Sequence, residues 1–219
     1  MGRPKKLIAI INDESPIVIV TGLETYSRIL KAAEELFIAK GFKGVSMKDI
    51  AKKVDITPAA LYYYFPKGKQ DLFLKMIEFL FEEWEQNVIK TVEACDNIQD
   101  CLLLLTMEFL ADSHGQIFIL LRDVHTQIKD ESDKQKIWEC YGSTYMHAIT
   151  QIFERAIEKG EISQDIPAHL MATIYHSMNF ALTRSPHLAA YRNSPSEAKK
   201  LATTIVAILL DGIRQPERL

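Results

Sequence analysis

The sequence has no long apolar run and few cysteines. Across its 219 residues, no apolar stretch approaches the roughly 18 residues that span a bilayer, which argues against a transmembrane helix. The basic residues 1–6 are followed by a short apolar stretch that residues 12–14 (Asn-Asp-Glu) interrupt, so a secretory signal peptide is not expected. Cys95, Cys101 and Cys140 lack the spacing of metal ligands. Free thiols in a reducing cytoplasm are therefore predicted.

The sequence also lacks the motifs on which enzymes and metalloproteins depend. It contains no glycine-rich phosphate loop and no persuasive pairing of a nucleophile with a general base. The histidines show no His-x-x-x-His spacing and no supporting cysteine cluster, so neither a metal site nor a cofactor is expected. An all-α enzyme is therefore rejected. Repeats, low-complexity tracts and Pro/Gly-rich linkers are absent as well, so the expected domain boundary lies within the long helix after Asp71, where the charge balance changes sign.

The net formal charge of −3 hides an uneven distribution. Residues 1–75 carry 13 Lys and Arg against 8 Asp and Glu, whereas residues 76–219 carry 13 against 21. A basic N-terminal third attached to an acidic remainder is typical of a protein that presents one end to a polyanion. The distribution of charge therefore points to nucleic acid, although the total charge does not.

Nearly all of the sequence after Gly22 has the apolar spacing of helices, which predicts an all-α protein of about nine helices. Gly41 suits the left-handed position that ends the first of them. The apolar face of that helix comprises Ile29, Leu30, Ala33, Leu36 and Phe37. Further helices are predicted from residue 69 onward and over residues 98–110, 117–128, 134–159, 167–184 and 195–212.

The first 22 residues differ from this pattern. Residues 7–11 and 17–20 are rich in β-branched side chains and flank a turn-like segment, which is compatible with a short β-hairpin. An isolated hairpin is only marginally stable in water, so it would need a surface to pack on. The alternative is a loosely held N-terminal arm.

Residues 46–65 have the pattern of a helix-turn-helix. Ser46 followed by Asp49 predicts a capped first helix, and Thr57 followed by Pro58 predicts a capped second helix. The two are separated by residues 54–56. In a helix-turn-helix the second helix enters the major groove of DNA, so we expect this segment to read a DNA sequence.

The residue types of the second helix suit close approach to DNA. Ala59 and Ala60 are small, and their methyl groups can meet a thymine methyl. Thr57 can hydrogen-bond a base or a phosphate, and the tyrosines at the helix end can reach phosphate oxygens. A lysine at the start of the next helix can share a phosphate with the free N–H groups there. The predicted DNA-binding residues are Ser46, Met47, Lys48, Thr57, Pro58, Ala59, Ala60, Tyr62, Tyr63, Tyr64, Lys67 and Lys69.

Residues 2–6 (Gly-Arg-Pro-Lys-Lys) add a weaker signal. Their pattern resembles arms in which an arginine, here Arg3, enters a narrow A·T-rich minor groove. The alternative is a set of solvated basic residues at a chain end, which is common.

The segment from Tyr26 to Phe73 resembles the DNA-binding domain of the TetR (tetracycline-repressor-like) family of transcriptional regulators. The sequence departs from the usual family pattern at the turn, where Asp55 replaces glycine, and in the link 66–69, which is one residue longer. Asp tolerates left-handed geometry, so the turn is expected to survive. The matching residues are Ile29, Ala32, Ala33, Leu36, Phe37, Gly41, Phe42, the segments 45–51 and 61–65, Lys69 and Leu72.

The resemblance implies a second, larger helical domain that binds a small-molecule effector and forms a homodimer. The expected division is an arm at 1–22, the helix-turn-helix domain at 23–71 and a regulatory domain at 72–219. The expected function is a cytoplasmic repressor that binds a palindromic operator and is released by the effector. The alternative is a helical protein-interaction module without DNA binding.

Apolar faces on the last two predicted helices mark the expected dimer contact. They comprise Leu170, Ile174, Met178, Ala181, Leu201, Ile205, Ile208 and Leu209. Aromatic and polar residues in the apolar helices of the larger domain are the candidates for an effector pocket, although an ordinary core or surface role stays open for each polar one. They are Phe109, Phe118, Arg122, His125, Trp138, Tyr141, Tyr145, Tyr175, His176 and Asn179.

Overall fold

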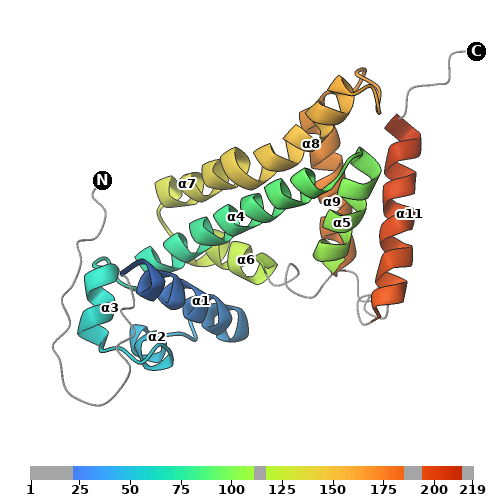
Figure 1. Ribbon diagram of the computed structural model, residues 1–219. Coiled ribbons are helices and arrows are strands. Elements are labelled where there is room, and N and C mark those ends of the chain that lie inside the picture. Colours follow the sequence, from blue (N-terminus) through green and yellow to red (C-terminus); the bar gives the residue numbers. More distant parts are fainter. Residues whose placement is uncertain (1–21, 111–116, 185–193, 214–219) are drawn as a thin grey trace, which may run out of the picture.

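The computed structural model describes residues 22–110, 117–184 and 194–213 (Figure 1). Within these ranges every regular element is a helix, as predicted. None of the described helices combines the length and the apolar character needed to cross a membrane. The predicted hairpin or arm at residues 7–20 and the minor-groove candidate Arg3 lie outside the described residues.

Three helices form the N-terminal unit: α1 (Gly22–Lys40), α2 (Met47–Lys53) and α3 (Pro58–Tyr64). Gly41 follows α1 with a φ of 68°, the left-handed geometry expected of a C-cap residue. Asp55, in the turn between α2 and α3, has a φ of 56°. The aspartate therefore adopts the left-handed geometry that the turn was expected to require of it.

Side-chain caps set the starts of α2 and α3. The Asp49 N–H donates to Ser46 Oγ at 3.2 Å, and the Ser46 N–H donates to Asp49 Oδ2 at 2.8 Å. The Ala60 N–H donates to Thr57 Oγ1 at 3.1 Å, and Pro58 occupies the first position of α3. Both helices begin where the sequence predicts, because each cap satisfies N–H groups that have no partner within the helix.

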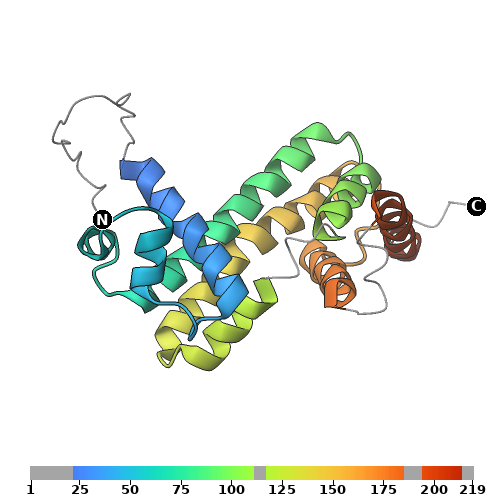
Figure 2. The ribbon, with the colours of Figure 1, turned by 90° about the horizontal axis from the view of Figure 1, so that it is seen from below.

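Helix α4 (Lys69–Ala94) connects the three-helix unit to the rest of the molecule (Figure 1). With 26 residues it is the longest described helix, about 39 Å at the usual rise per residue. Figure 2 shows that the molecule is elongated along this direction, with α1 to α3 at one end. Helix α4 therefore extends from the three-helix unit into the larger part of the molecule.

The remaining helices build the larger part of the molecule. Helices α7 and α8 are joined by a π-helical turn, Gly142–Met146, so that the helix predicted over 134–159 is one nearly continuous rod. It starts earlier than predicted, at Glu131, because the carboxylate of Asp130 caps it. The bounds are α5 Ile98–Leu110, α6 Ile117–Gln127, α7 Glu131–Tyr141, α8 His147–Glu158, α9 Ala168–Arg184 and α11 Pro195–Ile213.

Two large hydrophobic clusters hold these helices together. The first runs from α1 to α3 across the N-terminal half of α4 and on to α6 and α7, with Phe37, Phe73 and Leu120 completely buried in it. The second lies between the C-terminal half of α4 and helices α5, α8, α9 and α11. Because the first cluster crosses residue 71, the predicted domain boundary lies within a shared core, and the division stays a proposal.

Candidate nucleic-acid interface

Helix α3 is anchored on one side and open on the other. Leu61 is completely buried and Phe65, just after the helix, is 1% exposed. On the opposite side Tyr62 and Tyr63 are 48% and 60% exposed, far more than large aromatic residues in a core. Thr57, Pro58 and Ala59 are exposed on the first turn of α3, and Ala60 is half-buried. The helix therefore presents small side chains and two tyrosines to solvent.

The three consecutive tyrosines do not share one environment. Tyr64 is half-buried and its ring lies 6.4 Å from that of Tyr26 on α1. Tyr63 packs edge-on against Tyr64 at 5.6 Å but keeps an exposed face. Tyr62 and Tyr63 are thus the better placed for contacts with DNA, whereas Tyr64 also supports the packing of α3 on α1.

The start of α2 contains one buried and two exposed candidates. Lys48 is exposed, and its ammonium belongs to the basic surface of this unit. Ser46 is exposed, but its hydroxyl donates to Asp49 Oδ2 at 2.6 Å, and these hydrogen bonds lower the pKa of the Asp49 carboxyl. Met47 is 7% exposed and packs in the core, so it lies among the residues that support the surface.

Lys69 has a different environment from the one expected for a phosphate ligand. Its ammonium donates to the carbonyls of Phe42 at 2.9 Å and Val45 at 3.0 Å, and it lies 4.3 Å from the centre of the Phe42 ring. Lys69 therefore ties the loop after α1 to the start of α4. Lys67, two residues earlier, is exposed.

The buried carboxylate of Asp123, which is not among the predicted site residues, links the same loop to α6. Asp123 is 5% exposed, and its Oδ2 accepts from the Phe42 N–H at 2.7 Å. Arg122 pairs with Asp123 Oδ1 at 3.3 Å. The signal in the sequence is weak, a single aspartate within an apolar helical stretch. Together, Lys69 and Asp123 hold the loop after α1 from two sides.

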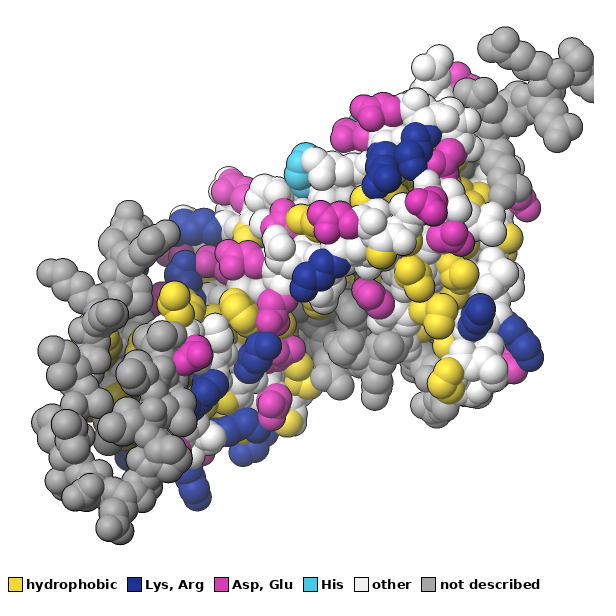
Figure 3. All heavy atoms as spheres, viewed as in Figure 1, with side chains coloured by type: hydrophobic (Ala, Val, Ile, Leu, Met, Phe, Trp, Pro, Cys, Tyr) yellow, Lys and Arg dark blue, Asp and Glu magenta, His cyan; other side chains and the backbone are white. Residues whose placement is uncertain are grey.

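Charged side chains surround this unit. On the face shown in Figure 3, Lys and Arg side chains lie over α1 and α2 with acidic side chains among them. Two of the lysines are paired: Lys53 with Glu35 at 2.5 Å, and Lys31 with Glu83 of α4 at 3.1 Å. These exposed pairs contribute little stability, about 0–1 kcal/mol each. The basic character of this end is therefore available to a polyanion.

In the larger part of the molecule, several of the predicted effector residues meet in one aromatic cluster. The ring of Tyr145 lies 5.9 Å from Tyr141, 6.2 Å from Phe109 and 5.7 Å from His176. Tyr141 Oη and His176 Nε2 are 2.7 Å apart and share a hydrogen bond. Trp84 of α4, another of the aromatic residues in the larger part of the molecule, also contacts this cluster, with its ring 5.4 Å from that of Tyr145.

Three buried polar atoms of this region have no hydrogen-bond partner among the described residues: Tyr145 Oη, His176 Nδ1 and Asn179 Oδ1. Such atoms are rare because each forfeits its hydrogen bonds to water. Burial also lowers the pKa of His176 to about 4 and raises the pKa values of Tyr141 and Tyr145. All three rings are therefore uncharged near neutral pH.

The other predicted effector residues lie elsewhere. Tyr175 is completely buried, and its hydroxyl donates to the Leu102 carbonyl at 3.2 Å and lies 3.1 Å from Thr106 Oγ1, as a core residue does. Trp138 is 46% exposed at the margin of the cluster, 6.2 Å from Tyr141. Arg122 and His125 are exposed on α6 and are not part of the cluster. The side chain of Phe118 lies outside the described residues.

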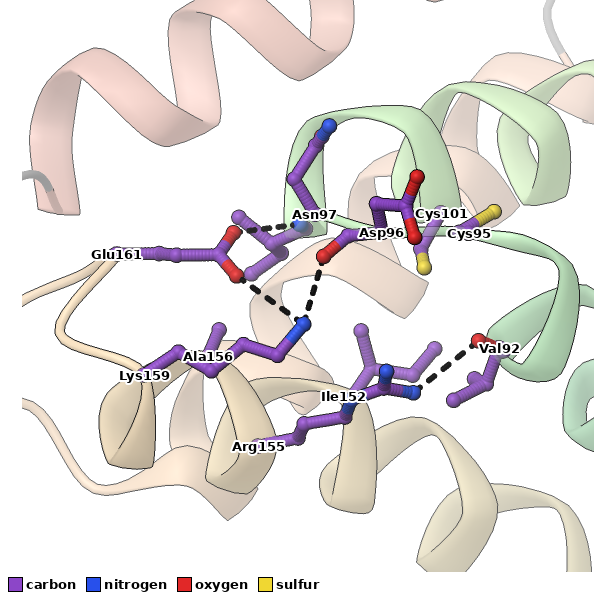
Figure 4. A pocket seen from close by; sticks show the side chains of 11 residues that line it. Val92, Cys95, Asp96, Asn97, Cys101, Ile152, Arg155, Ala156, Lys159 and Glu161 are labelled. Atoms are coloured by element: carbon purple, nitrogen blue, oxygen red, sulfur yellow. Dashed lines mark hydrogen bonds and ion pairs between the residues drawn. The ribbon is translucent and has the colours of Figure 1, made fainter.

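A pocket lies where α4 ends and α5 begins (Figure 4). Arg155 donates to the carbonyl of Val92, and Lys159 donates to the carbonyl of Asp96. Glu161 accepts from the Ile98 N–H at 2.7 Å. These charged groups satisfy the free ends of α4 and α5, as helix caps do. The pocket therefore joins α4, α5 and α8.

The predicted dimer residues differ in how much of each side chain is exposed. Leu170 and Ile174 on α9 are 45% and 41% exposed, and Ile208 on α11 is 64% exposed. Ile205 and Leu209 are only 4% and 6% exposed, because α11 turns this face toward α5. These two residues therefore belong to the core of one chain, which corrects their placement on the contact surface. Ala181 is exposed, while Met178 and Leu201 are half-buried.

Comparison with known proteins places the N-terminal unit within a described family. Residues 29–76 match the bacterial regulatory proteins of the tetR family. The chain is 36% identical over 145 residues to the probable HTH-type transcriptional regulator YttP of Bacillus subtilis, and the match covers 64% of this chain but only 66% of YttP. It is 30% identical over 137 residues to the HTH-type transcriptional regulator LmrA of Bacillus subtilis, covering 58% of this chain and 72% of LmrA.

Solved structures share the fold over most of the chain. Salmonella enterica GusR matches with a TM-score of 0.67 at 22% identity, covering 87% of this chain and 97% of GusR. FadR from Bacillus subtilis, solved in complex with stearoyl-CoA, matches with a TM-score of 0.64 at 15% identity, covering 86% of this chain and all of FadR. The likeness in fold therefore extends through the larger helical part as well as the three-helix unit.

Proposed function

Because this chain belongs to the TetR family of bacterial transcriptional regulators and is a DNA-binding regulator, we propose that it is a cytoplasmic repressor that binds a palindromic operator as a homodimer and is released by a small-molecule effector. The open face of α3 is the observation that carries this proposal. Thr57 and Ala59 are exposed there beside Tyr62 and Tyr63, while Leu61 fixes the helix from below. Small residues allow approach to base edges, and the hydroxyls suit phosphate oxygens.

A homodimer follows from the limited reach of one such unit. A single helix-turn-helix reads few bases, whereas a two-fold dimer reads two half-sites about 34–36 Å apart. The exposed apolar residues Leu170, Ile174 and Ile208 on α9 and α11 supply a surface for a four-helix contact. These helices lie at the end of the molecule opposite α1 to α3, so pairing there leaves both α3 helices free (Figure 2).

The arrangement around α4 supports release by an effector. Trp84 in α4 contacts the aromatic cluster, and Lys69 at the start of the same helix holds the loop after α1. Asp123 attaches that loop to α6 as well. A ligand that binds more tightly to a state with a displaced α4 changes the spacing of the two α3 helices, with a typical coupling of about 1–3 kcal/mol.

A salt titration of DNA binding tests the proposal. The probe is the DNA upstream of the gene for this chain, and the control is a scrambled duplex of equal length. Affinity for the upstream DNA is expected to fall steeply between 50 and 200 mM salt, by about 10³-fold if six phosphates are contacted. Absence of salt-dependent, sequence-selective binding overturns the repressor proposal and favours a helical interaction module instead.

A further inference from the structure

The aromatic cluster around Tyr145 has the composition of a recognition site. Six rings from five elements meet there: Trp84 on α4, Phe109 on α5, Tyr141 at the end of α7, Tyr145 in the π-helical turn, and His176 and Phe180 on α9. Single π-helical turns within α-helices are frequent at functional sites. A core that served packing alone would not require this concentration of polar aromatic residues.

The unpartnered atoms show what this cluster lacks. Tyr145 is 2% exposed, yet its Oη has no partner among the described residues. The same holds for His176 Nδ1, while its Nε2 is bonded to Tyr141. Tyr175 differs from Tyr145, because its equally buried hydroxyl has two hydrogen-bond partners. The protein therefore keeps hydrogen-bonding groups unused where it otherwise satisfies them.

The electrostatics of the cluster exclude a charged ligand in its interior. The cluster contains no Lys, Arg or Asp, and His176 is neutral at physiological pH because burial lowers its pKa. Glu108 is exposed at its edge, where it lines a cavity of about 10 Å³ with Trp84, Phe109 and Tyr145. An anion held among the rings would lose its hydration without gaining a counter-charge, which is strongly unfavourable. A cation would gain only the Glu108 carboxylate, whose exposure to solvent at the edge screens the attraction.

We propose, on the basis of the regulatory function proposed above, that the effector is an uncharged, planar aromatic molecule with a hydrogen-bonding group that Tyr145 and His176 recognise inside this cluster. The rings supply offset and edge-on contacts to its flat face. Tyr145 Oη donates to its polar group, and His176 Nδ1 forms a second hydrogen bond with it. The cavity has room for about one water molecule. Binding must therefore separate the rings, and Trp84 transmits that separation to α4.

Three probes with the same ring system test the charge requirement: 2-naphthamide, which is neutral, 2-naphthoate, which is anionic, and 2-naphthylmethylammonium, which is cationic. Each is titrated calorimetrically into the full chain without DNA. The amide is expected to bind at least tenfold more tightly than either ion. Equal or tighter binding of an ion, or no binding of the amide up to 1 mM, overturns the proposal.

Two tyrosine variants test the role of the unpartnered hydroxyl. Tyr145→Phe is expected to weaken binding of 2-naphthamide at least fivefold, while the melting temperature of the free chain stays the same or rises, because an unsatisfied buried hydroxyl is removed. Tyr175→Phe, the matched control, is expected to lower the melting temperature and to change affinity less than twofold. Unchanged affinity in Tyr145→Phe overturns the assignment. If that variant does not fold, His176→Phe must show the same loss of affinity.

Failure of the effector assignment and failure of the repressor proposal give different experimental outcomes. A chain that binds operator DNA with steep salt dependence but does not bind the amide overturns only the assignment of the effector class. A chain that binds the amide but no DNA overturns only the repressor proposal.

Discussion

At the scale of single residues, the predicted DNA-contacting side chains differ in what the fold leaves available. Tyr62 and Tyr63 stay exposed, whereas Met47 is buried and the ammonium of Lys69 is bonded to two carbonyls. Residue type and spacing alone do not distinguish these cases, because burial depends on the helices packed against each position. Mutations at Tyr62 and Met47 should therefore have different effects: the first should alter DNA affinity and the second should alter folding.

We predict that Tyr62→Phe weakens operator binding by about two- to tenfold with the same sequence preference, because it removes one hydrogen bond to a phosphate worth about 0.5–1.5 kcal/mol. Ala60→Leu is expected to weaken binding far more, since the larger side chain obstructs entry into the groove. Fluorescence anisotropy with the operator and with single-base variants measures both effects. Equal and small effects of the two substitutions would contradict the proposed docking of α3.

His176 predicts a pH dependence of stability. Its pKa falls from 6.5 to about 4 in the folded chain, so the unfolded chain binds a proton that the folded chain does not bind between these values. Stability is therefore expected to decline as pH falls from about 6.5 to about 4, by at most about 3 kcal/mol from this group. Urea unfolding at pH 7 and pH 4.5 should show a smaller decline for His176→Gln. A decline as large as in the native chain would contradict this account.

At the scale of elements, the loop after α1 is where two parts of the protein meet. Lys69 of α4 and Asp123 of α6 bind its carbonyl and N–H groups, and a Cβ atom on Gly41 would lie 3.4 Å from Asp123 Oδ2. Local sequence patterns do not predict these contacts, because the partners are far apart in the sequence. Phe42 and Asp123, for example, are 81 residues apart. The loop position, and with it the orientation of α2 and α3, depends on the larger part of the molecule.

We predict that Asp123→Ala destabilises the chain by about 1–3 kcal/mol, because it removes the buried acceptor of the Phe42 N–H. The same change should also weaken operator binding. Asp123→Asn retains an acceptor oxygen and should preserve most of both properties. Arg122→Ala changes an exposed side chain beside it and should cost less than about 0.5 kcal/mol. Denaturant unfolding and operator titrations measure the set; equal effects of Asp123→Ala and Arg122→Ala would contradict the role given to Asp123.

At the scale of the whole molecule, the exposed apolar surface of α9 and α11 supports the proposed homodimer. We predict that the chain has twice its monomer mass of 25.0 kDa in light scattering, and that Ile208→Asp reduces this to the monomer mass. The physical reason is that a carboxylate cannot be buried unpaired in an apolar contact.

Leu104→Asp is the matched control for that experiment. Leu104 is also apolar and 45% exposed, but it lies on α5, outside the proposed contact. The control should remain dimeric. Dissociation by both substitutions, or by neither, would contradict the assignment of the contact to α9 and α11.

The sequence by itself determined the local structure of this protein. Ser46, Asp49, Thr57 and Pro58 specify where α2 and α3 begin, because capping depends on residues within one turn of each other. The apolar spacing likewise predicted the all-α class, since a 3.6-residue period is a local property. The resemblance to one family rests on the same short segment, which is dense in matching residues.

Only the tertiary structure decided which predicted residues are accessible and which meet. It directed Ile205 and Leu209 into the core of the chain while leaving Ile208 exposed. It also brought Trp84, Phe109, Tyr145 and His176 together from four separate helical segments. The physical reason is that burial and side-chain contacts depend on how whole helices cross and pack, which the sequence specifies only through their combined fit.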